Sequence, residues 1–170
     1  MKYSDDYHDY VIKDGKFVGK FEKMYQDHES PWNQKDIKFK SDTAISIEYL
    51  RRIEKKDVGR GHNANDGINV LELGCGLGYF TEQIRQTLCN NSKILGIDIS
   101  ETAIKKAKER FTKCNFQAGD ILDFNIYKEF NPNVILMPQI TWYVLDKIKP
   151  LLEFLKNNYP NVIIIHNLVT

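Results

Sequence analysis

Three glycines separated by single residues are the feature of this 170-residue sequence that points most directly to chemistry. Gly74, Gly76 and Gly78 follow an apolar run over residues 70–73, in which Glu72 is the single acidic residue. Glycine lacks a Cβ, so such a segment can turn sharply from a strand into a helix and let a ligand approach the main chain. The segment therefore predicts a small-molecule site at the end of a strand.

Two aspartates further along the chain follow other apolar runs. Asp98 ends a run over residues 93–98, and Asp120 comes shortly after one over residues 115–118. A carboxylate at the position of Asp98 can accept hydrogen bonds from the two vicinal hydroxyls of a ribose. Because ligands of open parallel sheets bind beyond the carboxyl ends of the strands, we expect these carboxylates and Glu72 to face one site.

Short apolar strands that alternate with helices must position these residues. Strands are predicted over residues 68–73, 93–98, 115–118, 133–138 and 161–166. Helices are predicted over residues 43–56, 78–89, 100–111 and 145–158, with Asp42 and Ser100 as caps of the first and third. Residues 57–67 are predicted to form a loop, because turn-forming residues dominate them. The predicted fold class is α/β: a doubly wound, mostly parallel sheet with helices on both faces.

The segment from Val70 to Thr81 resembles the cofactor-binding motif of class I S-adenosylmethionine-dependent methyltransferases. The resemblance implies a Rossmann-like fold, S-adenosylmethionine as cofactor, S-adenosylhomocysteine as product and a small-molecule acceptor. It also implies that Glu72 helps to hold the ammonium group of the cofactor and that Asp120 receives the adenine amino group. The cofactor-binding positions that it implies are Trp32, Glu72, Gly74, Cys75, Gly76, Asp98, Ile99, Gly119, Asp120, Ile121 and Met137.

An upstream segment carries a second resemblance. Tyr25, followed by Pro31 and Trp32, is similar to a pattern before the sheet in several small-molecule methyltransferases. The similarity implies that Trp32 lies over the cofactor as part of a lid, with simple core packing as the alternative. We expect residues 1–60 to form this lid segment and residues 61–170 the cofactor-binding core of one domain.

Methyl transfer from a sulfonium mainly requires that a nucleophile be held in line in a water-poor pocket. An oxygen nucleophile of high pKa also benefits from a general base, for which His166 at the end of the fifth predicted strand is the candidate. A histidine that merely closes a buried strand is the alternative. Gln139, Thr141 and Tyr143 follow the fourth predicted strand and could orient the acceptor. The expected acceptor atom is an oxygen, in surface-polysaccharide or other secondary metabolism.

Two other functions stay open on the sequence alone. A dinucleotide-binding loop of an NAD-dependent oxidoreductase usually has glycine or alanine five residues after the first glycine, where this chain has Tyr79. An acidic residue before the first glycine also suits a sulfonium amino acid better than a pyrophosphate. A module that binds S-adenosylmethionine without catalysis would have the same motif and show no turnover.

Composition and charge exclude several classes of protein. The formal net charge of +1 gives no basic excess for nucleic acid. There is no apolar run of about 18 residues, so no membrane segment is predicted, and the polar N-terminus predicts a cytoplasmic protein. The three cysteines lack paired or metal-like spacing, and no metal site is expected.

The chain ends just after the fifth predicted strand. Members of the family that it resembles usually add another helix and an antiparallel hairpin, and this C-terminal hairpin is missing here. An apolar strand at the edge of a sheet needs to be paired or covered. Two alternatives follow: either the chain is truncated after Thr170, or a partner covers the fifth strand, for which a homodimer is the expectation.

Overall fold

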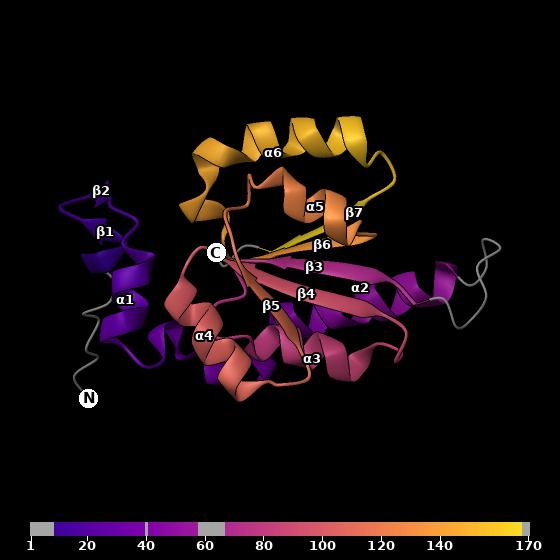
Figure 1. Cartoon of the computed structure of the whole chain (residues 1–170), viewed down its shortest axis with the longest axis horizontal. Coiled ribbons are helices and arrows are strands. Elements are labelled where there is room, and N and C mark those ends of the chain that lie inside the picture. The colour runs from indigo at the N-terminus through magenta and orange to yellow at the C-terminus, as the bar shows by residue number, and fades with distance from the viewer. Residues whose placement is uncertain (1–8, 40, 58–66, 168–170) are drawn as a thin grey trace.

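The computed structural model describes residues 9–39, 41–57 and 67–167, and a parallel five-stranded sheet lies at its centre (Figure 1). The spatial order of the strands is β5-β4-β3-β6-β7. Their bounds are β3 (Asn69–Leu73), β4 (Lys93–Asp98), β5 (Asn115–Ala118), β6 (Val134–Pro138) and β7 (Ile163–Asn167). The chain runs outward from β3 to β5 and then returns to place β6 beside β3. This reversal confirms the doubly wound α/β fold and predicts a ligand crevice at the carboxyl ends of β3 and β6.

Helices cover both faces of the sheet. In the view of Figure 1, α5 and α6 lie above it and α2, α3 and α4 below it. The bounds are α2 (Ser41–Asp57), α3 (Tyr79–Thr87), α4 (Glu101–Arg110), α5 (Phe124–Phe130) and α6 (Leu145–Asn158). Val70 belongs to the core on the α2 and α3 side, whereas its neighbour Leu71 belongs to the core on the α5 and α6 side. Both residues are fully buried, as expected for a central parallel strand that is covered by helices on both faces.

Every predicted strand and helix is present, with bounds that differ by at most two residues, and the main differences are as follows. α5 was not predicted, because a helix of seven residues is too short to show a helical period; Asp123 caps it by accepting a hydrogen bond from Asn125 N. α2 begins at Ser41, two residues before the predicted start, so the backbone of Asp42 lies inside the helix rather than at the position before it. The predicted strand over residues 161–166 begins later and ends at Asn167. Most of the predicted loop, residues 58–66, lies outside the described residues.

The N-terminal segment forms small elements at one end of the sheet (Figure 1). They are a hairpin of β1 (Ile12–Lys13) and β2 (Lys16–Phe17), the helix α1 (Phe21–Asp27) and the irregular helix η2 (Pro31–Phe39). No period in the sequence predicted them. The predicted domain boundary at residue 60 lies outside the described residues and stays a prediction.

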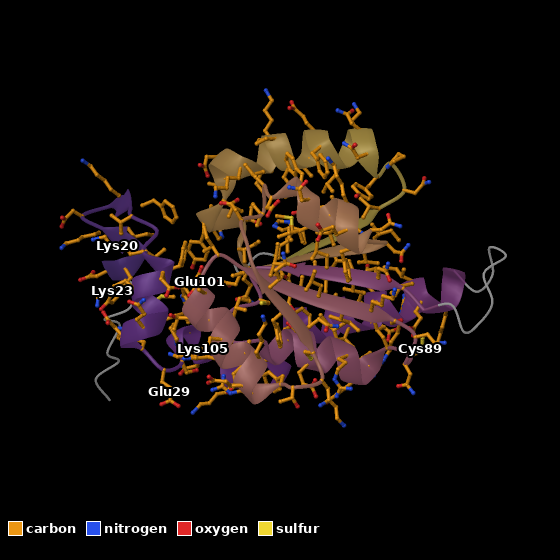
Figure 2. All side chains as sticks on the ribbon, in the orientation of Figure 1. Lys20, Lys23, Glu29, Cys89, Glu101 and Lys105 are labelled. Carbon is orange, nitrogen blue, oxygen red and sulfur yellow. The ribbon has the colours of Figure 1, made fainter. Side chains whose placement is uncertain are left out.

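Side chains fill the space between the sheet and its helices, and charged groups lie at the periphery (Figure 2). Lys105 on α4 and Lys23 on α1 are examples of exposed charges. The edge strand β7 is less well covered than the others, since Ile163 and Ile164 are 41% and 37% exposed. None of the described helices is long and apolar enough to cross a membrane.

Candidate functional site

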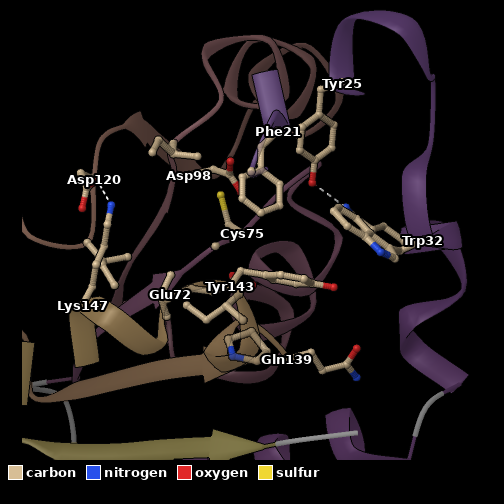
Figure 3. A pocket seen from close by; sticks show the side chains of 18 of the residues that line it. Phe21, Tyr25, Trp32, Glu72, Cys75, Asp98, Asp120, Gln139, Tyr143 and Lys147 are labelled. Atoms are coloured by element: carbon tan, nitrogen blue, oxygen red, sulfur yellow. Dashed lines mark hydrogen bonds and ion pairs between the residues drawn. The ribbon is translucent and has the colours of Figure 1, made fainter. Parts of the chain in front are cut away.

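A cavity of about 400 Å³ opens at the carboxyl ends of the central strands. Its size falls within the range of roughly 300–1,000 Å³ that is typical of small-molecule sites. The strands contribute carboxylates, while the N-terminal segment and the residues after β6 contribute aromatic rings. Figure 3 shows Asp120 and Lys147 on one side of this cavity and Trp32 on the other, with Phe21 and Tyr143 between them.

The glycine loop leaves β3 with a left-handed backbone. Gly74 has φ 72° and Gly76 has φ 52°, values that strain residues with a Cβ. Space is also short, because a Cβ on Gly74 would lie 2.4 Å from Ile140 Cγ2 and a Cβ on Gly76 would lie 2.5 Å from Gln34 Oε1. The backbone nitrogens of Gly74 and Cys75 both donate hydrogen bonds to Ile97 O, at 2.8 and 2.9 Å. The loop is therefore fixed against β4 and presents its backbone to the cavity.

Gly78 explains why a large side chain is tolerated at Tyr79. Gly78 caps α3 with φ 79°, and a Cβ there would lie 2.5 Å from Phe116 Cζ. The close approach of helix to strand thus occurs at Gly78, four residues after the first glycine. Tyr79 faces outward from this contact and packs edge-on against Phe111, with ring centroids 5.3 Å apart.

Glu72 is a buried carboxylate at the end of β3. Its side chain is 1% exposed, and its Oε2 accepts a hydrogen bond of 2.5 Å from Thr81 Oγ1. Burial and the nearby charge of Asp98 raise its pKa to about 7, against the opposing effect of the Thr81 hydrogen bond. Among the described residues no lysine or arginine forms an ion pair with Glu72. A cationic group that entered the cavity would therefore stabilise the ionised carboxylate.

Asp98 connects the glycine loop to the start of α4. Its Oδ2 accepts a hydrogen bond from Gly76 N and its Oδ1 accepts one from Ser100 N, both at 2.9 Å. Burial raises the pKa of Asp98, although these two hydrogen bonds oppose the shift. Since each carboxylate oxygen can accept more than one hydrogen bond, Asp98 retains the capacity to receive the hydroxyls of a ligand.

Asp120 already has a cationic partner. One carboxylate oxygen accepts a hydrogen bond of 2.9 Å from Leu122 N, and the other forms an ion pair with Lys147 in the first turn of α6. Partial burial raises the pKa of Asp120, but the hydrogen bonds from Lys147 and Leu122 outweigh it and hold the pKa below its ordinary value. Lys147 is thus placed where the sequence resemblance implies an adenine amino group.

Aromatic rings form the opposite side of the cavity. Tyr143, in η4 (Thr141–Tyr143), contacts Phe21, Trp32 and Phe17, with ring centroids 5.5, 6.0 and 6.5 Å apart. Trp32 has φ 57°, a backbone conformation that is uncommon for a bulky residue. One part of the cavity is thus lined by carboxylates and another part by aromatic rings.

Comparison with known sequences decides the family of the chain. The family described as "Methyltransferase domain" matches residues 64–170, which is more than half of the sequence. The chain belongs to this methyltransferase domain family. The match and the fold together confirm the class I, Rossmann-like architecture that the sequence predicted.

Individual relatives of this methyltransferase domain are distant. Malonyl-[acyl-carrier protein] O-methyltransferase of Bacillus anthracis is 30% identical over 119 residues, which cover 65% of this chain and 43% of that protein. The chain thus spans less than half the length of this curated relative. The plantazolicin methyltransferase BpumL has a TM-score of 0.54 at 22% identity, over 79% of this chain and 52% of that structure. The sugar N-methyltransferase KedS8 of Streptoalloteichus has a TM-score of 0.53 at 15% identity, over 76% of this chain and 49% of that structure.

The methyltransferase domain brings most of the predicted cofactor-binding positions together. All of them line the cavity except Gly76 and Met137, while their roles in binding stay predictions. Gly76 instead donates its N–H to Asp98. Met137 is 3% exposed and packs in the core beneath α6, because its side chain points away from the crevice into the α5 and α6 layer. Ile99 is 54% exposed and Ile121 is buried at 8%.

Of the residues proposed for catalysis, Gln139 and Tyr143 line the cavity and His166 does not. His166 is exposed on β7, and its Nε2 is hydrogen-bonded to Thr141 Oγ1. The hydrogen bond to Thr141 holds the His166 ring beside a residue that is not part of the cavity wall. Thr141, which the sequence placed near the acceptor, is likewise absent from the cavity wall.

Two residues of the site were missed in the sequence. Gln34 donates a hydrogen bond to Tyr25 Oη (2.8 Å) and accepts one from Leu77 N (2.7 Å), which joins the N-terminal segment to the glycine loop. The sequence around Gln34 has no helical or strand period that would identify it as a site residue. Lys147 carried a usable signal, because a cation in the first turn of a helix opposes the helix dipole and indicates a specific partner.

Proposed function

We propose that this domain transfers a methyl group from S-adenosylmethionine to a small-molecule acceptor. The main support is that Glu72, Asp98 and Asp120, at or just beyond the carboxyl ends of three adjacent strands, converge on one cavity beside the left-handed glycine loop. Buried carboxylates are costly unless they are paired, so a ligand with a positive charge and hydroxyl groups is favoured there. S-adenosylmethionine carries an ammonium group, a sulfonium and a ribose.

The chain contains suitable partners for each part of this cofactor. Glu72 would hold the ammonium group, and Asp98 would accept hydrogen bonds from the ribose hydroxyls. The apolar side chains of Ile99 and Ile121 line the cavity near Asp120 and would contact the adenine. When bound, the cofactor supplies a methyl group already activated by the positive sulfur. The aromatic side of the cavity would exclude water and hold the acceptor in line.

We further propose that the accepting atom is an oxygen. In support, the Bacillus anthracis relative is named an O-methyltransferase. The expectation of a surface-polysaccharide precursor as acceptor stays a prediction, because the similarity to the sugar N-methyltransferase concerns the fold alone.

Calorimetric titration with S-adenosylmethionine, S-adenosylhomocysteine and NAD tests the cofactor. We expect the two sulfur compounds to bind and NAD to give no signal. Asp98→Asn should weaken their affinity about 10- to 100-fold, because it removes charge-assisted hydrogen bonds. Asp14→Asn is the matched control: Asp14 is exposed in the β1–β2 turn, with a left-handed backbone that asparagine tolerates. Binding of NAD with no binding of the sulfur compounds would refute the proposal.

A module that binds the cofactor without turnover is the second candidate. It is favoured by one observation, namely that the predicted base His166 lies outside the cavity. Formation of S-adenosylhomocysteine over a panel of acceptors separates the two functions. Turnover with any acceptor above the rate without acceptor excludes the binding module, and binding without turnover across the panel supports it.

A further inference from the structure

The aromatic side of the cavity is made of four rings from separate segments of the chain. Phe17 lies on β2, Phe21 on α1, Trp32 on η2 and Tyr143 on η4. Figure 3 shows Trp32 across the cavity from the Asp120–Lys147 pair, with Phe21 and Tyr143 between them. We refer to these four residues as the aromatic wall.

The aromatic wall continues to the mouth of the cavity. Phe17 is 54% exposed and packs nearly parallel to Tyr143, with an interplanar angle of 21°. Large apolar side chains that gather at the mouth of a pocket are unfavourable in water and indicate a binding surface.

Hydrogen bonds hold part of the aromatic wall in place before any ligand binds. Gln34 ties η2 to Tyr25 and to the backbone of the glycine loop. Trp32 and Asn33, directly before it, both have positive φ values of 57° and 49°. Such backbone conformations persist only where the surroundings enforce them. A preorganised wall of rings favours a rigid, flat ligand, because neither partner loses much conformational entropy on binding.

Few polar groups face an acceptor at this side. Within the aromatic wall they are the Tyr143 hydroxyl and the Trp32 indole N–H. The Gln139 amide and the Tyr25–Gln34 pair also line the cavity, and Gln34 already forms hydrogen bonds with Tyr25 and Leu77 N. A sugar carries a hydroxyl on most of its carbon atoms, and each hydroxyl buried without a partner costs about 1–3 kcal/mol. A flat hydrocarbon ring has no such cost and gains from stacking.

We infer that the methyl acceptor presents a flat, apolar ring to the aromatic wall, with its nucleophilic atom directed toward the centre of the cavity. The inference rests on the proposed methyltransferase function and adds the class of its acceptor. It is an alternative to the surface-polysaccharide precursor expected from the sequence, because the sugars of such a precursor are polyhydroxylated.

The test measures binding of two probes to the whole chain by saturation-transfer NMR, with and without S-adenosylhomocysteine. 2-Naphthol is the flat, apolar probe, and methyl α-glucoside is the polyhydroxylated one. We expect 2-naphthol to bind the cofactor-loaded protein and the glucoside to give no signal. In Tyr143→Ala and Phe17→Ala the dissociation constant for 2-naphthol should rise at least about tenfold, because a stacking partner is lost.

Two control variants separate stacking from other effects. Tyr143→Phe keeps the ring and should leave the dissociation constant within about twofold. Tyr49→Ala removes a ring that is 55% exposed on α2 and should also have no effect. Because Phe17 is more than half exposed, Phe17→Ala is expected to fold even if Tyr143→Ala does not.

Binding of the glucoside in place of 2-naphthol overturns the inference, as does 2-naphthol binding that is equal in Phe17→Ala and in the unaltered chain. These failures differ from failure of the proposed function. If S-adenosylhomocysteine does not bind but 2-naphthol still depends on Phe17 and Tyr143, the cofactor proposal is wrong and the aromatic site stands. If S-adenosylhomocysteine binds and 2-naphthol does not, only the acceptor class is wrong.

Discussion

Glu72 illustrates at the scale of one residue how a binding site reduces the stability of the protein that carries it. The folded chain buries this carboxylate beside a second one, Asp98, and raises its pKa from 4.5 to about 7. Between these pH values the folded state keeps a proton that the unfolded state releases. The free energy of unfolding therefore falls as pH rises through this window, and the loss is complete above pH 7.

Glu72→Gln should stabilise the protein in alkaline solution while impairing its function. At pH 8 we expect the free energy of unfolding to rise by roughly 1–3 kcal/mol, because the buried charge is gone. At pH 5, where Glu72 is already protonated in the folded state, the gain should vanish. Urea denaturation at the two pH values measures this. An equal gain at both pH values would contradict the assigned cause.

Binding of S-adenosylmethionine should also depend on the charge of Glu72. In the unaltered protein we expect affinity to increase from pH 6 to pH 8 as Glu72 ionises, and to remain nearly constant in Glu72→Gln. Calorimetry at three pH values tests this, with Glu101→Gln as control because Glu101 is exposed. A pH dependence that persists in Glu72→Gln would assign it to another group.

At the scale of elements, α1 is held against α4 at both ends. Glu22 accepts hydrogen bonds from Ser100 Oγ (2.6 Å), Thr102 Oγ1 (2.5 Å) and Thr102 N (3.2 Å) at the start of α4. Lys106 donates from Nζ to Tyr25 O (2.5 Å) and His28 O (3.0 Å) at the end of α1. The negative charge of Glu22 thus lies at the N-terminus of α4, and the positive charge of Lys106 lies at the C-terminus of α1. Each charge complements the dipole of the helix that it meets. This arrangement places the aromatic wall over the cavity.

Glu22→Gln should loosen this contact. Burial raises the pKa of Glu22, but its hydrogen bonds outweigh this effect and bring the pKa to about 2, so the side chain stays charged from pH 5 to pH 8. We expect a loss of about 1 kcal/mol, a small value because solvent still reaches this half-buried group, and the loss should be the same throughout this pH range.

Limited proteolysis and denaturation measure the effect of Glu22→Gln, with Glu101→Gln, an exposed glutamate in the first turn of α4, as control. Faster cleavage within residues 9–34 is expected for Glu22→Gln alone. Equal cleavage rates in the two variants would show that Glu22 does not hold α1 in place.

At the scale of the whole molecule, β7 leaves an apolar strand at the edge of the sheet. Among the described strands it pairs only with β6, and Ile163 and Ile164 are exposed at 41% and 37% on its two faces. Such edges promote association unless something covers them. The homodimer expected from the sequence stays a proposal, with β7 as its contact.

Sedimentation velocity over a range of concentrations tests the dimer. We expect a monomer–dimer equilibrium in which Ile164→Lys shifts the chain to monomer, because a charge on the edge opposes strand pairing. Lys156→Glu, an exposed change on α6, should leave the equilibrium unaltered. A chain that is monomeric at all concentrations would contradict the proposal.

The sequence alone determined the sheet, the glycine loop and the acidic strand ends. β4, β5 and α6 have the predicted bounds, because apolar periodicity is a local property of the chain. Asp98 and Asp120 could be placed together since parallel strands present their carboxyl ends at one edge of a sheet.

Only the tertiary structure decided which side chains share the cavity. The Asp120–Lys147 pair, the contact of Gln34 with the glycine loop and the aromatic wall join residues far apart in sequence, so no local pattern encodes them. His166 ends a predicted strand, yet whether its side chain enters the cavity depends on packing, which here pairs it with Thr141 outside the cavity wall. Periodicity specifies which elements form, whereas the packing of elements specifies which residues meet.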